Sequence, residues 1–358
     1  MHTGRPRLGP AWVTCGAALI VAWLGASAHA QDARPGPPVG STTAKADAGG
    51  TGRLPDGLMS TLDTLGGSGA PEGAGATWFP TRPVRGQPTG LGLTDVFLGG
   101  SVPVRETATE TIFGTATARS LSVRSNAVLP DDRVRLPAQL WDIQAGGLYV
   151  GQLGGGESWG VGGTVGSASD RPFHSGRELL VNGLAFYRSP SGDRDAWLYY
   201  VVSATNGQVG RNIPVPGVAY EFTRERLSGV VGFPFVTLNY TPADLVRAEF
   251  YYAPLTDLTA KLLVGPADGL RGYGGFAWVN QSWFRAGRAN RDDLLFLYEK
   301  RLEAGVKWAA RPRVHLQAGG GYAFDRYFVE NTGFSLTGRN RVDVAPGPYV
   351  SVQLLAEY

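Results

Sequence analysis

Four residues between positions 170 and 178 have side chains that could together carry out hydrolysis or acyl transfer. Ser175 could act as the nucleophile and His174 as its base, with Asp170 or Glu178 as the acid that orients the imidazole. Proximity in the chain does not provide the geometry of a catalytic triad, and no recognisable serine motif surrounds Ser175. We therefore interpret this segment as a polar turn, with an enzyme of this kind as the alternative.

A second set of polar residues recurs at alternate positions in two stretches near the C-terminus, opposite rows of apolar residues. Alternate positions of a strand share a face, so we expect these side chains to line an interior. They could form a charged constriction that selects small solutes. Alternatively, their ion pairs could stiffen a filled wall, and the sequence leaves both interpretations open. The residues are Glu299, Arg301, Glu303, Lys307, Arg313, His315 and Gln317.

Metal and cofactor chemistry finds little support in the sequence. Cys15 is the only cysteine and lies in a predicted leader, while His174 and His315 beyond it lack the spacing of metal ligands. No glycine-rich loop precedes a helix that could bind phosphate. We therefore expect no cofactor and no metal. Removal of residues 1–30 would lower the formal net charge from +3 to +1, and without a basic run we expect no nucleic-acid partner.

The alternation that carries the charged residues predicts two long strands joined by a short turn. Residues 294–308 and 314–324 have apolar side chains at alternate positions, and 310–312 form the turn. A tilted strand of about 9–11 residues crosses a bilayer, whereas strands of soluble proteins usually have about 5–6 residues. The length of this hairpin therefore favours a transmembrane β-barrel over a secreted β-sandwich.

Similar alternation recurs from about residue 90 onward, and glycine is abundant, with 52 of 358 residues. We predict an all-β protein, a transmembrane antiparallel β-barrel of about 12–14 strands. The pair 216–225 and 228–240 is the weakest of the fourteen candidates, because Pro234 lies inside it and proline cannot donate to a strand ladder. The candidates are 92–104, 111–125, 139–153, 157–168, 179–188, 196–205, 216–225, 228–240, 246–252, 258–264, 270–285, 294–308, 314–324 and 349–358.

The N-terminal part of the chain predicts export followed by a flexible segment. Arg5 and Arg7 precede an apolar stretch and an Ala28-His29-Ala30 site, so residues 1–30 are expected to be a cleaved signal peptide. Residues 31–77 are rich in glycine and proline and contain no aromatic residue, which predicts a disordered periplasmic extension. The barrel domain is then expected over residues 78–358.

The end of the chain combines strand alternation with a terminal aromatic residue. In bacterial outer-membrane barrels such a strand closes the barrel, and its last aromatic residue belongs to the signal that the assembly machinery reads. With the predicted leader, this indicates the bacterial outer membrane, with its lipid, lipopolysaccharide and barrel assembly machinery as partners. The residues that share the apolar face are Tyr358, Ala356, Leu354, Val352 and Val350.

Three short motifs and the closing strand together carry a family resemblance. They are Leu136 to Ile143, Pro216 to Phe222, the pair of segments Gly232-Phe233-Pro234 and Asn239 to Asp244, and then Gly347-Pro348-Tyr349. In this order they resemble an uncharacterised family of outer-membrane β-barrels, a domain of unknown function, over roughly residues 90–358. The resemblance implies an outer-membrane barrel and assigns no ligand or catalytic residue.

The leading functional hypothesis is a porin-like or transport channel for small polar or amphipathic solutes, and not an enzyme. Two alternatives are a lipid-acting barrel enzyme and a closed structural or adhesion barrel. A fold supports many functions, so the barrel prediction does not decide among them.

Overall fold

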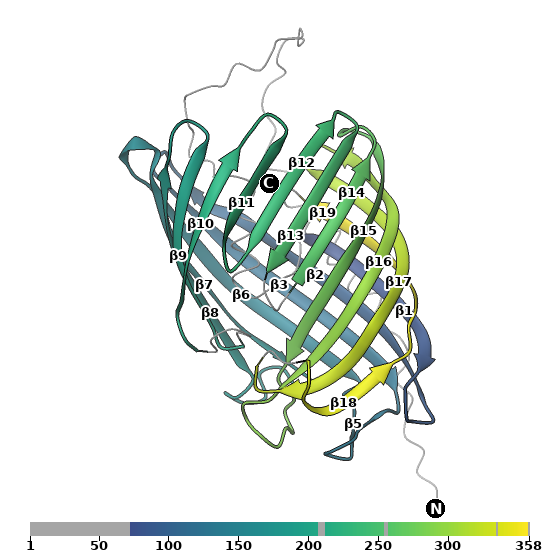
Figure 1. The fold of residues 1–358 in the computed structure, drawn as a ribbon. Helices are drawn as coiled ribbons and strands as arrows, with labels where there is room; N and C mark the ends of the chain where they lie inside the picture. The colour runs from purple at the N-terminus through teal and green to yellow at the C-terminus, as the bar shows by residue number, and fades with distance from the viewer. Residues whose placement is uncertain (1–71, 207–211, 254–256, 334–335, 357–358) are drawn as a thin grey trace, which may run out of the picture. The chain divides into compact units, whose positions relative to one another are not determined.

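The chain forms a closed β-barrel in the computed structural model, which describes residues 72–206, 212–253, 257–333 and 336–356 (Figure 1). Consecutive strands of the ring pair antiparallel, and β1 pairs with β19 to close it. Within the described residues the main sheet has seventeen strands, of which sixteen form the ring and β18 extends it at one end. The predicted all-β antiparallel barrel is therefore confirmed.

Strand length divides the ring into two walls. The short wall has strands of 7–9 residues: β10 (Val215–Thr223), β11 (Leu227–Phe233), β12 (Val236–Ala243), β13 (Val246–Ala253) and β14 (Asp257–Val264). The long wall has strands of 10–18 residues: β15 (Leu270–Trp283), β16 (Leu294–Arg311), β17 (Val314–Asn331), β19 (Gly347–Ala356), β1 (Gly73–Pro83), β2 (Gly90–Glu106), β3 (Glu110–Ser125), β6 (Gln139–Gln152), β7 (Ser158–Ser169), β8 (Leu179–Pro190) and β9 (Asp195–Ala204).

The two ends of the barrel differ. At the turn end, drawn at the top of Figure 1, Gly73 lies opposite Leu355, and short connections such as 107–109 and 244–245 join the strands. The other end, the loop end, carries the longer connections 126–138, 170–178, 284–293 and 332–338. Connection 126–138 contains a small hairpin of β4 (Val128–Leu129) and β5 (Val134–Arg135), and β18 (Arg339–Val344) lies beside β17; one short 3-10 helix covers Gly154–Gly156.

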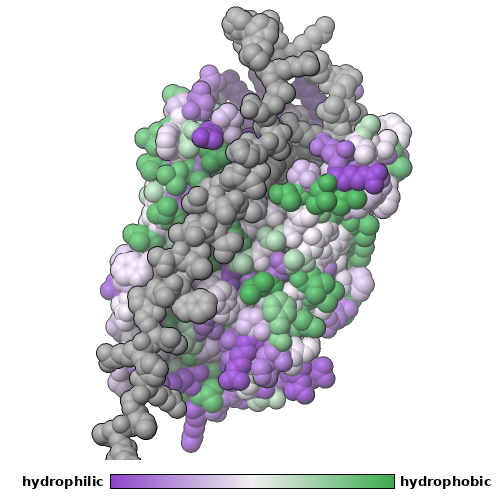
Figure 2. All heavy atoms as spheres, turned by 180° about the vertical axis from the view of Figure 1, so that it is seen from behind, coloured by the Kyte–Doolittle hydropathy of each residue, from purple (hydrophilic) through white to green (hydrophobic). Residues whose placement is uncertain are grey.

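Side chains alternate between the outer and inner surfaces of the barrel. On β16, Leu302, Val306 and Trp308 are 54%, 44% and 50% exposed on the outer surface, while Arg301 and Glu303 occupy the alternate, inner positions. Figure 2 shows hydrophobic residues over the middle of the outer wall and hydrophilic residues gathered toward its rims. The alternation that predicted this strand is therefore present in the barrel.

The ring contains two strands more than the fourteen candidates. One is β1, which begins at Gly73 inside the predicted extension, so the barrel starts before residue 78. The glycine-rich composition predicted disorder, but Gly75 lies in a strand and packs against the aromatic ring of Phe97. A Cβ added at Gly75 would lie 2.5 Å from Cε1 of Phe97. The other arises because the candidate 228–240 is two strands, β11 and β12, with Pro234 in the turn between them.

β19 closes the ring between β17 and β1. Val350 and Val352 are 55% and 54% exposed on its outer face, and Leu354 and Ala356 follow at alternate positions. Tyr358 lies outside the described residues. The use of this strand as an assembly signal stays a prediction.

An apolar core joins strands from opposite sides of the barrel at the loop end. Leu121 of β3, Leu180 of β8 and Trp283 of β15 are each at most 2% exposed and belong to one cluster. Beyond Trp283, the backbone N–H of Phe284 donates to the carbonyl of Ala168 on β7 at 2.8 Å. β7 and β15 are eight strands apart in the ring of sixteen, so this contact crosses the barrel.

Candidate functional site

The charged residues singled out on β16 lie on its inner surface, but they do not act as one row. Glu299, Arg301 and Glu303 join two buried charge clusters, and Lys307 lies nearer the turn end. On β17, His315 and Gln317 occupy inner positions. Arg313 lies in the turn between β16 and β17, with a φ of 66°.

Glu299 is the centre of the first cluster. It accepts a hydrogen bond from Arg301 and another from Nε of Arg326 on β17, at 3.0 Å. The side chains of Glu299 and Arg326 are each 1% exposed. Both guanidinium groups lie over the ring of Phe79 from β1, with Arg301 5.1 Å and Arg326 4.4 Å from its centroid. These contacts hold two cations and one carboxylate at the inner surface of β16 and β17, against Phe79 from β1 on the far side of β19.

A second pair extends this cluster across the lumen. Arg119 of β3 donates to both oxygens of Asp95 on β2, at 2.9 and 2.5 Å. Nε2 of Gln281 on β15 also donates to Asp95, at 3.4 Å. Because β2 and β15 are not neighbours in the ring, this hydrogen bond spans the interior. We call Asp95, Arg119, Gln281, Glu299, Arg301 and Arg326 the charged belt.

A third group of polar contacts lies closer to the turn end. Nζ of Lys261 is 3.1 Å from Oε1 of Glu303, an ion pair outside hydrogen-bond geometry, and lies 5.6 Å from the ring centroid of Tyr273. The Tyr273 hydroxyl accepts a hydrogen bond from Gln317 at 3.2 Å, and the Tyr349 hydroxyl donates to Glu303 at 3.5 Å. The inner surface of β14–β17 and β19 is therefore polar along much of its height.

The inner surface on the other side of the barrel carries an apolar cluster beside polar pairs such as Arg188–Glu221 and Asn182–Gln144. A buried cluster there comes from β6, β8 to β11 and β13, and includes Phe186, Tyr200 and, in the turn between β11 and β12, Phe235. The ring of Tyr200 lies 5.7 Å from that of Phe235 and directly over Gly217, where a side chain would collide with it. The lumen thus has a buried apolar cluster on one side and the charged belt on the other.

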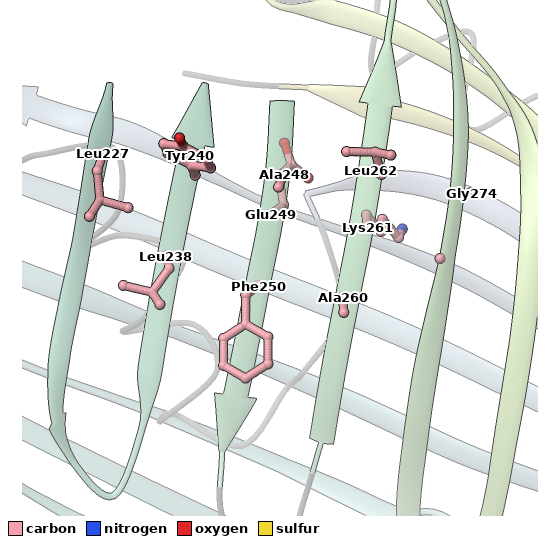
Figure 3. Close-up of a pocket in the computed structure, with 11 residues that line it drawn as sticks. Leu227, Leu238, Tyr240, Ala248, Glu249, Phe250, Ala260, Lys261, Leu262 and Gly274 are labelled. Carbon is pink, nitrogen blue, oxygen red and sulfur yellow. The ribbon is translucent and has the colours of Figure 1, made fainter. Parts of the chain in front are cut away.

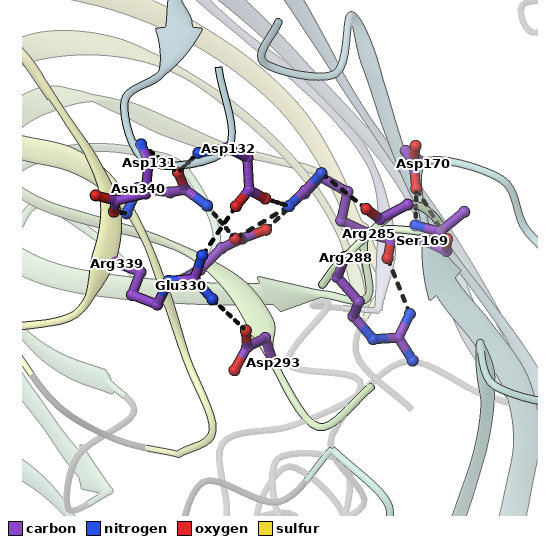
Figure 4. A network of polar contacts seen from close by, with 12 residues as sticks. Asp131, Asp132, Ser169, Asp170, Arg285, Arg288, Asp293, Glu330, Arg339 and Asn340 are labelled. Carbon is purple, nitrogen blue, oxygen red and sulfur yellow. Dashed lines mark hydrogen bonds and ion pairs between the residues drawn. The ribbon is translucent and has the colours of Figure 1, made fainter. Parts of the chain in front are cut away.

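A network of ion pairs closes the loop end (Figure 4). Arg285, from connection 284–293, donates to Glu330 of β17 at 2.6 Å and also pairs with Asp132 of connection 126–138. Asn340 of β18 accepts hydrogen bonds from the backbone N–H groups of Asp131 and Asp132, at 3.0 and 3.1 Å. Arg285 therefore links three segments that are far apart in the chain, and we call this arrangement the cap.

Charge interactions within the cap shift two pKa values. Burial opposes ionisation of Arg285, but Glu330 and Asp132 outweigh it and hold the pKa of the guanidinium above its usual value. Burial and the neighbouring Glu330 raise the pKa of the Asp293 carboxyl. The cap therefore contains one guanidinium, Arg285, whose charged form is stabilised, and one carboxyl, Asp293, whose ionisation is unfavourable.

The polar segment 170–178 forms part of the same end of the barrel. The Ser175 hydroxyl donates to Glu178 at 2.6 Å, and Asp170 accepts from the backbone N–H of Ala286 at 2.7 Å. Glu178 in turn lies 3.6 Å from Arg288. These contacts tie connection 170–178 to connection 284–293, and they place the Ser175 hydroxyl on Glu178 and not on His174.

Sequence reasoning missed Arg326, and a β-bulge explains why. Arg326 has the same parity as Phe324, which lies on the outer face of β17, so simple alternation points it outward. Asp325 has a φ of 48°, and the register shifts between Lys300↔Phe324 and Tyr298↔Tyr327. The extra residue turns Arg326 inward to Glu299. Asp95 and Arg119 were visible only as isolated charges within apolar strands, which could have marked them as inner residues.

The comparisons with known proteins assign no function to this geometry. No model of a known protein family matches the chain, and no curated protein gives a significant match. In the part of the chain that the structure describes, no group of three or more His, Asp or Glu residues is placed to hold a metal ion. The described residues also contain no helix that is long and apolar enough to span a membrane.

Proposed function

We propose that this protein is an integral outer-membrane β-barrel, exported through a signal peptide at residues 1–30, that passes small polar or amphipathic solutes. The observation that carries the proposal is the charged belt, which crosses the lumen between β2 and β15. Buried ion pairs contribute little net stability, because desolvation offsets their attraction. A selective role explains their presence in the lumen better than a stabilising one.

Two features of the barrel support this location and activity. Exposed apolar side chains alternate with inner polar ones, as a wall between lipid and water requires. Barrels of about 8 strands are filled by side chains, whereas about 16–18 strands leave room for an aqueous channel. The apolar and charged sides of the lumen suit solutes that carry both kinds of group.

The belt and the cap then act as a gate in this proposal. The cap ties connections 126–138 and 284–293 to β17 and β18, and the apolar core lies inside the barrel at this end. A solute can pass only when these contacts open. The acidic and basic residues of the belt would then line the narrowest part of the path.

Conductance in planar bilayers tests the proposal. We expect stepwise conductance from the mature protein, and an altered open probability and ion selectivity in Glu299→Gln. Glu110→Gln is the matched control, because Glu110 pairs with Arg105 at the turn-end rim, where Arg105 is 64% exposed. A folded barrel, recognised by its mobility shift on boiling, that conducts nothing and supports no solute uptake would contradict the proposal.

A closed structural barrel is the second candidate, favoured by the Asp95–Gln281 hydrogen bond and by the contact between Phe284 and Ala168. It predicts no conductance in the wild type or in either variant. Neither function gives a catalytic role to His174 or Ser175. Turnover of membrane lipid that disappears in Ser175→Ala would replace both with an enzyme.

A further inference from the structure

The strands of the short wall are too short to span the apolar part of a bilayer. Its strands β11 to β14 have 7–8 residues, fewer than the about 9–11 that a tilted membrane strand needs. Eight residues at about 3.3 Å each, tilted by about 40°, span roughly 20 Å, whereas the apolar band of such barrels is about 25 Å tall. In Figure 1 the turn between β11 and β12 lies well above the loops of the long wall.

The outer face of the same wall carries a groove of about 720 Å³ (Figure 3). Ala248, Ala260 and Gly274 form its low floor, while Phe250 and Leu262 project beside it. Phe250 and Leu262 are 36% and 49% exposed. Small residues beside bulky ones allow close approach of another apolar surface, and such surfaces form contacts between membrane segments.

The charged residues beside the groove form ion pairs with other residues of the barrel and so do not make the groove a site for a polar ligand. Glu249 pairs with Arg247 at 3.0 Å, and Lys261 pairs with Glu303 at 3.1 Å. Arg247, Glu249 and Lys261 occupy the inner positions of β13 and β14, alternating with the apolar residues of the groove. The occupant of the groove must therefore be apolar.

The size of the short wall fits contact with an identical wall. Five strands about 4.8 Å apart and roughly 20 Å tall present roughly 500 Å² per copy, or roughly 1,000 Å² for two copies. That total reaches the about 1,000 Å² that a specific protein interface needs. A hydrophobic segment that is too short for its bilayer is accommodated by thinning of the bilayer or by oligomerisation.

We propose that the short wall, β10 to β14, is the surface through which two copies of this chain associate in the membrane. An isologous contact brings two walls of equal height together and removes the mismatch for both copies. Phe250 and Leu262 of one copy then pack toward the Ala248 and Ala260 floor of the other. The inference rests on the membrane location proposed above, but not on solute passage.

Cysteine cross-linking in membranes tests the contact directly. In a Cys15→Ser background, Leu262→Cys is placed beside the groove and Val350→Cys, 55% exposed on the long wall, serves as the control. A short bis-maleimide is expected to give a dimer from Leu262→Cys and none from Val350→Cys. No dimer from Leu262→Cys, or equal dimer from both, would overturn the inference.

A bulky substitution then tests the groove itself. Ala260→Trp fills the floor, and Ala116→Trp adds the same ring to the outer face of β3 in the long wall. We expect Ala260→Trp to lower the cross-linked fraction of Leu262→Cys several-fold and to give the mass of a single copy in nanodiscs. Ala116→Trp should change neither. Loss of the boiling-dependent mobility shift in the wild type would instead remove the membrane barrel on which the inference rests.

Discussion

The two walls of the barrel differ in the contacts that their side chains make. The long wall holds the charged belt, in which Glu299 and Arg326 are each 1% exposed, and it supports the cap through Arg285 and Glu330. The short wall contributes to the apolar cluster around Tyr200 and Phe235 and has a groove on its outer face. The long wall therefore holds the buried charges of the belt and the cap, while the short wall packs apolar side chains beside the Arg247–Glu249 pair on its inner face and has an apolar groove on its outer face.

The long wall is therefore stabilised by paired charges, and the short wall depends more on apolar packing. Removal of one partner of a buried ion pair lowers the free energy of unfolding strongly, because the other charge remains unpaired in a poorly hydrated site. The stability of an apolar cluster instead depends on side-chain volume and on how well the side chains pack. Substitutions chosen in each wall should therefore differ in the size and the nature of their effects.

The largest effect is expected for Arg285→Ala in the cap. The change leaves Glu330 and Asp132 without their buried cation, which should cost about 3–5 kcal/mol of unfolding free energy. Urea unfolding in lipid vesicles measures the loss, and proteolysis of connection 284–293 should accelerate. Arg339→Ala is the matched control: Arg339 pairs with the same Asp132 at 3.0 Å but is 51% exposed, so about 0–1 kcal/mol is expected. Equal losses in the two variants would contradict burial as the cause.

An intermediate effect is expected for Gly217→Ala in the short wall. The new methyl group would collide with the ring of Tyr200, whose position is fixed by Phe235 and by a hydrogen bond to Phe233. Overpacking of this kind costs about 1–3 kcal/mol. Gly183→Ala on β8 is the control, because no atom lies within 4 Å of its added Cβ. The same vesicle unfolding assay should separate the two variants, and a neutral Gly217→Ala would show that the apolar side tolerates displacement of Tyr200.

The smallest effect is a pH dependence that originates at Asp293. Its folded-state pKa is raised by burial and by Glu330, so its ionised form opposes folding. This unfavourable contribution is absent below the ordinary aspartate pKa of about 3.9 and becomes complete as pH rises through the raised value. Asp293→Asn should therefore stabilise the protein relative to the wild type at pH 7, with a smaller difference at pH 4. Midpoints of thermal unfolding measure both differences, and an equal difference at the two pH values would exclude Asp293 as the cause.

The alternation of apolar and polar residues predicted the barrel and most of its strands, because a wall between two environments imposes a period of two on its sequence. The alternation gave wrong positions where a bulge or a turn interrupts the period of two. It also could not predict contacts between residues on distant strands. The bulge at Asp325 reverses the side of Arg326, and Pro234 separates β11 from β12.

The candidate site was harder to predict than the fold. Glu299 and Arg301 could be placed on an inner face, but their partners come from strands distant in sequence. Asp95 and Gln281 are 186 residues apart, and no periodicity relates them. The cap joins irregular connections through Arg285, and such connections carry no repeating pattern from which their contacts could be read.

The contact between β7 and β15 also sets an order of events in folding. Phe284 and Ala168 lie far apart in the chain, and Ala286 and Asp170, which form the next hydrogen bond, are 116 residues apart. Forming such contacts early would require closure of a very long loop, which carries a large entropy cost before any neighbouring strand is in place. Each pair of adjacent strands can form locally, so the crossing contacts should form late, after the ring between them is assembled. Protection of the Phe284 backbone amide from hydrogen exchange would thus mark the completion of the ring.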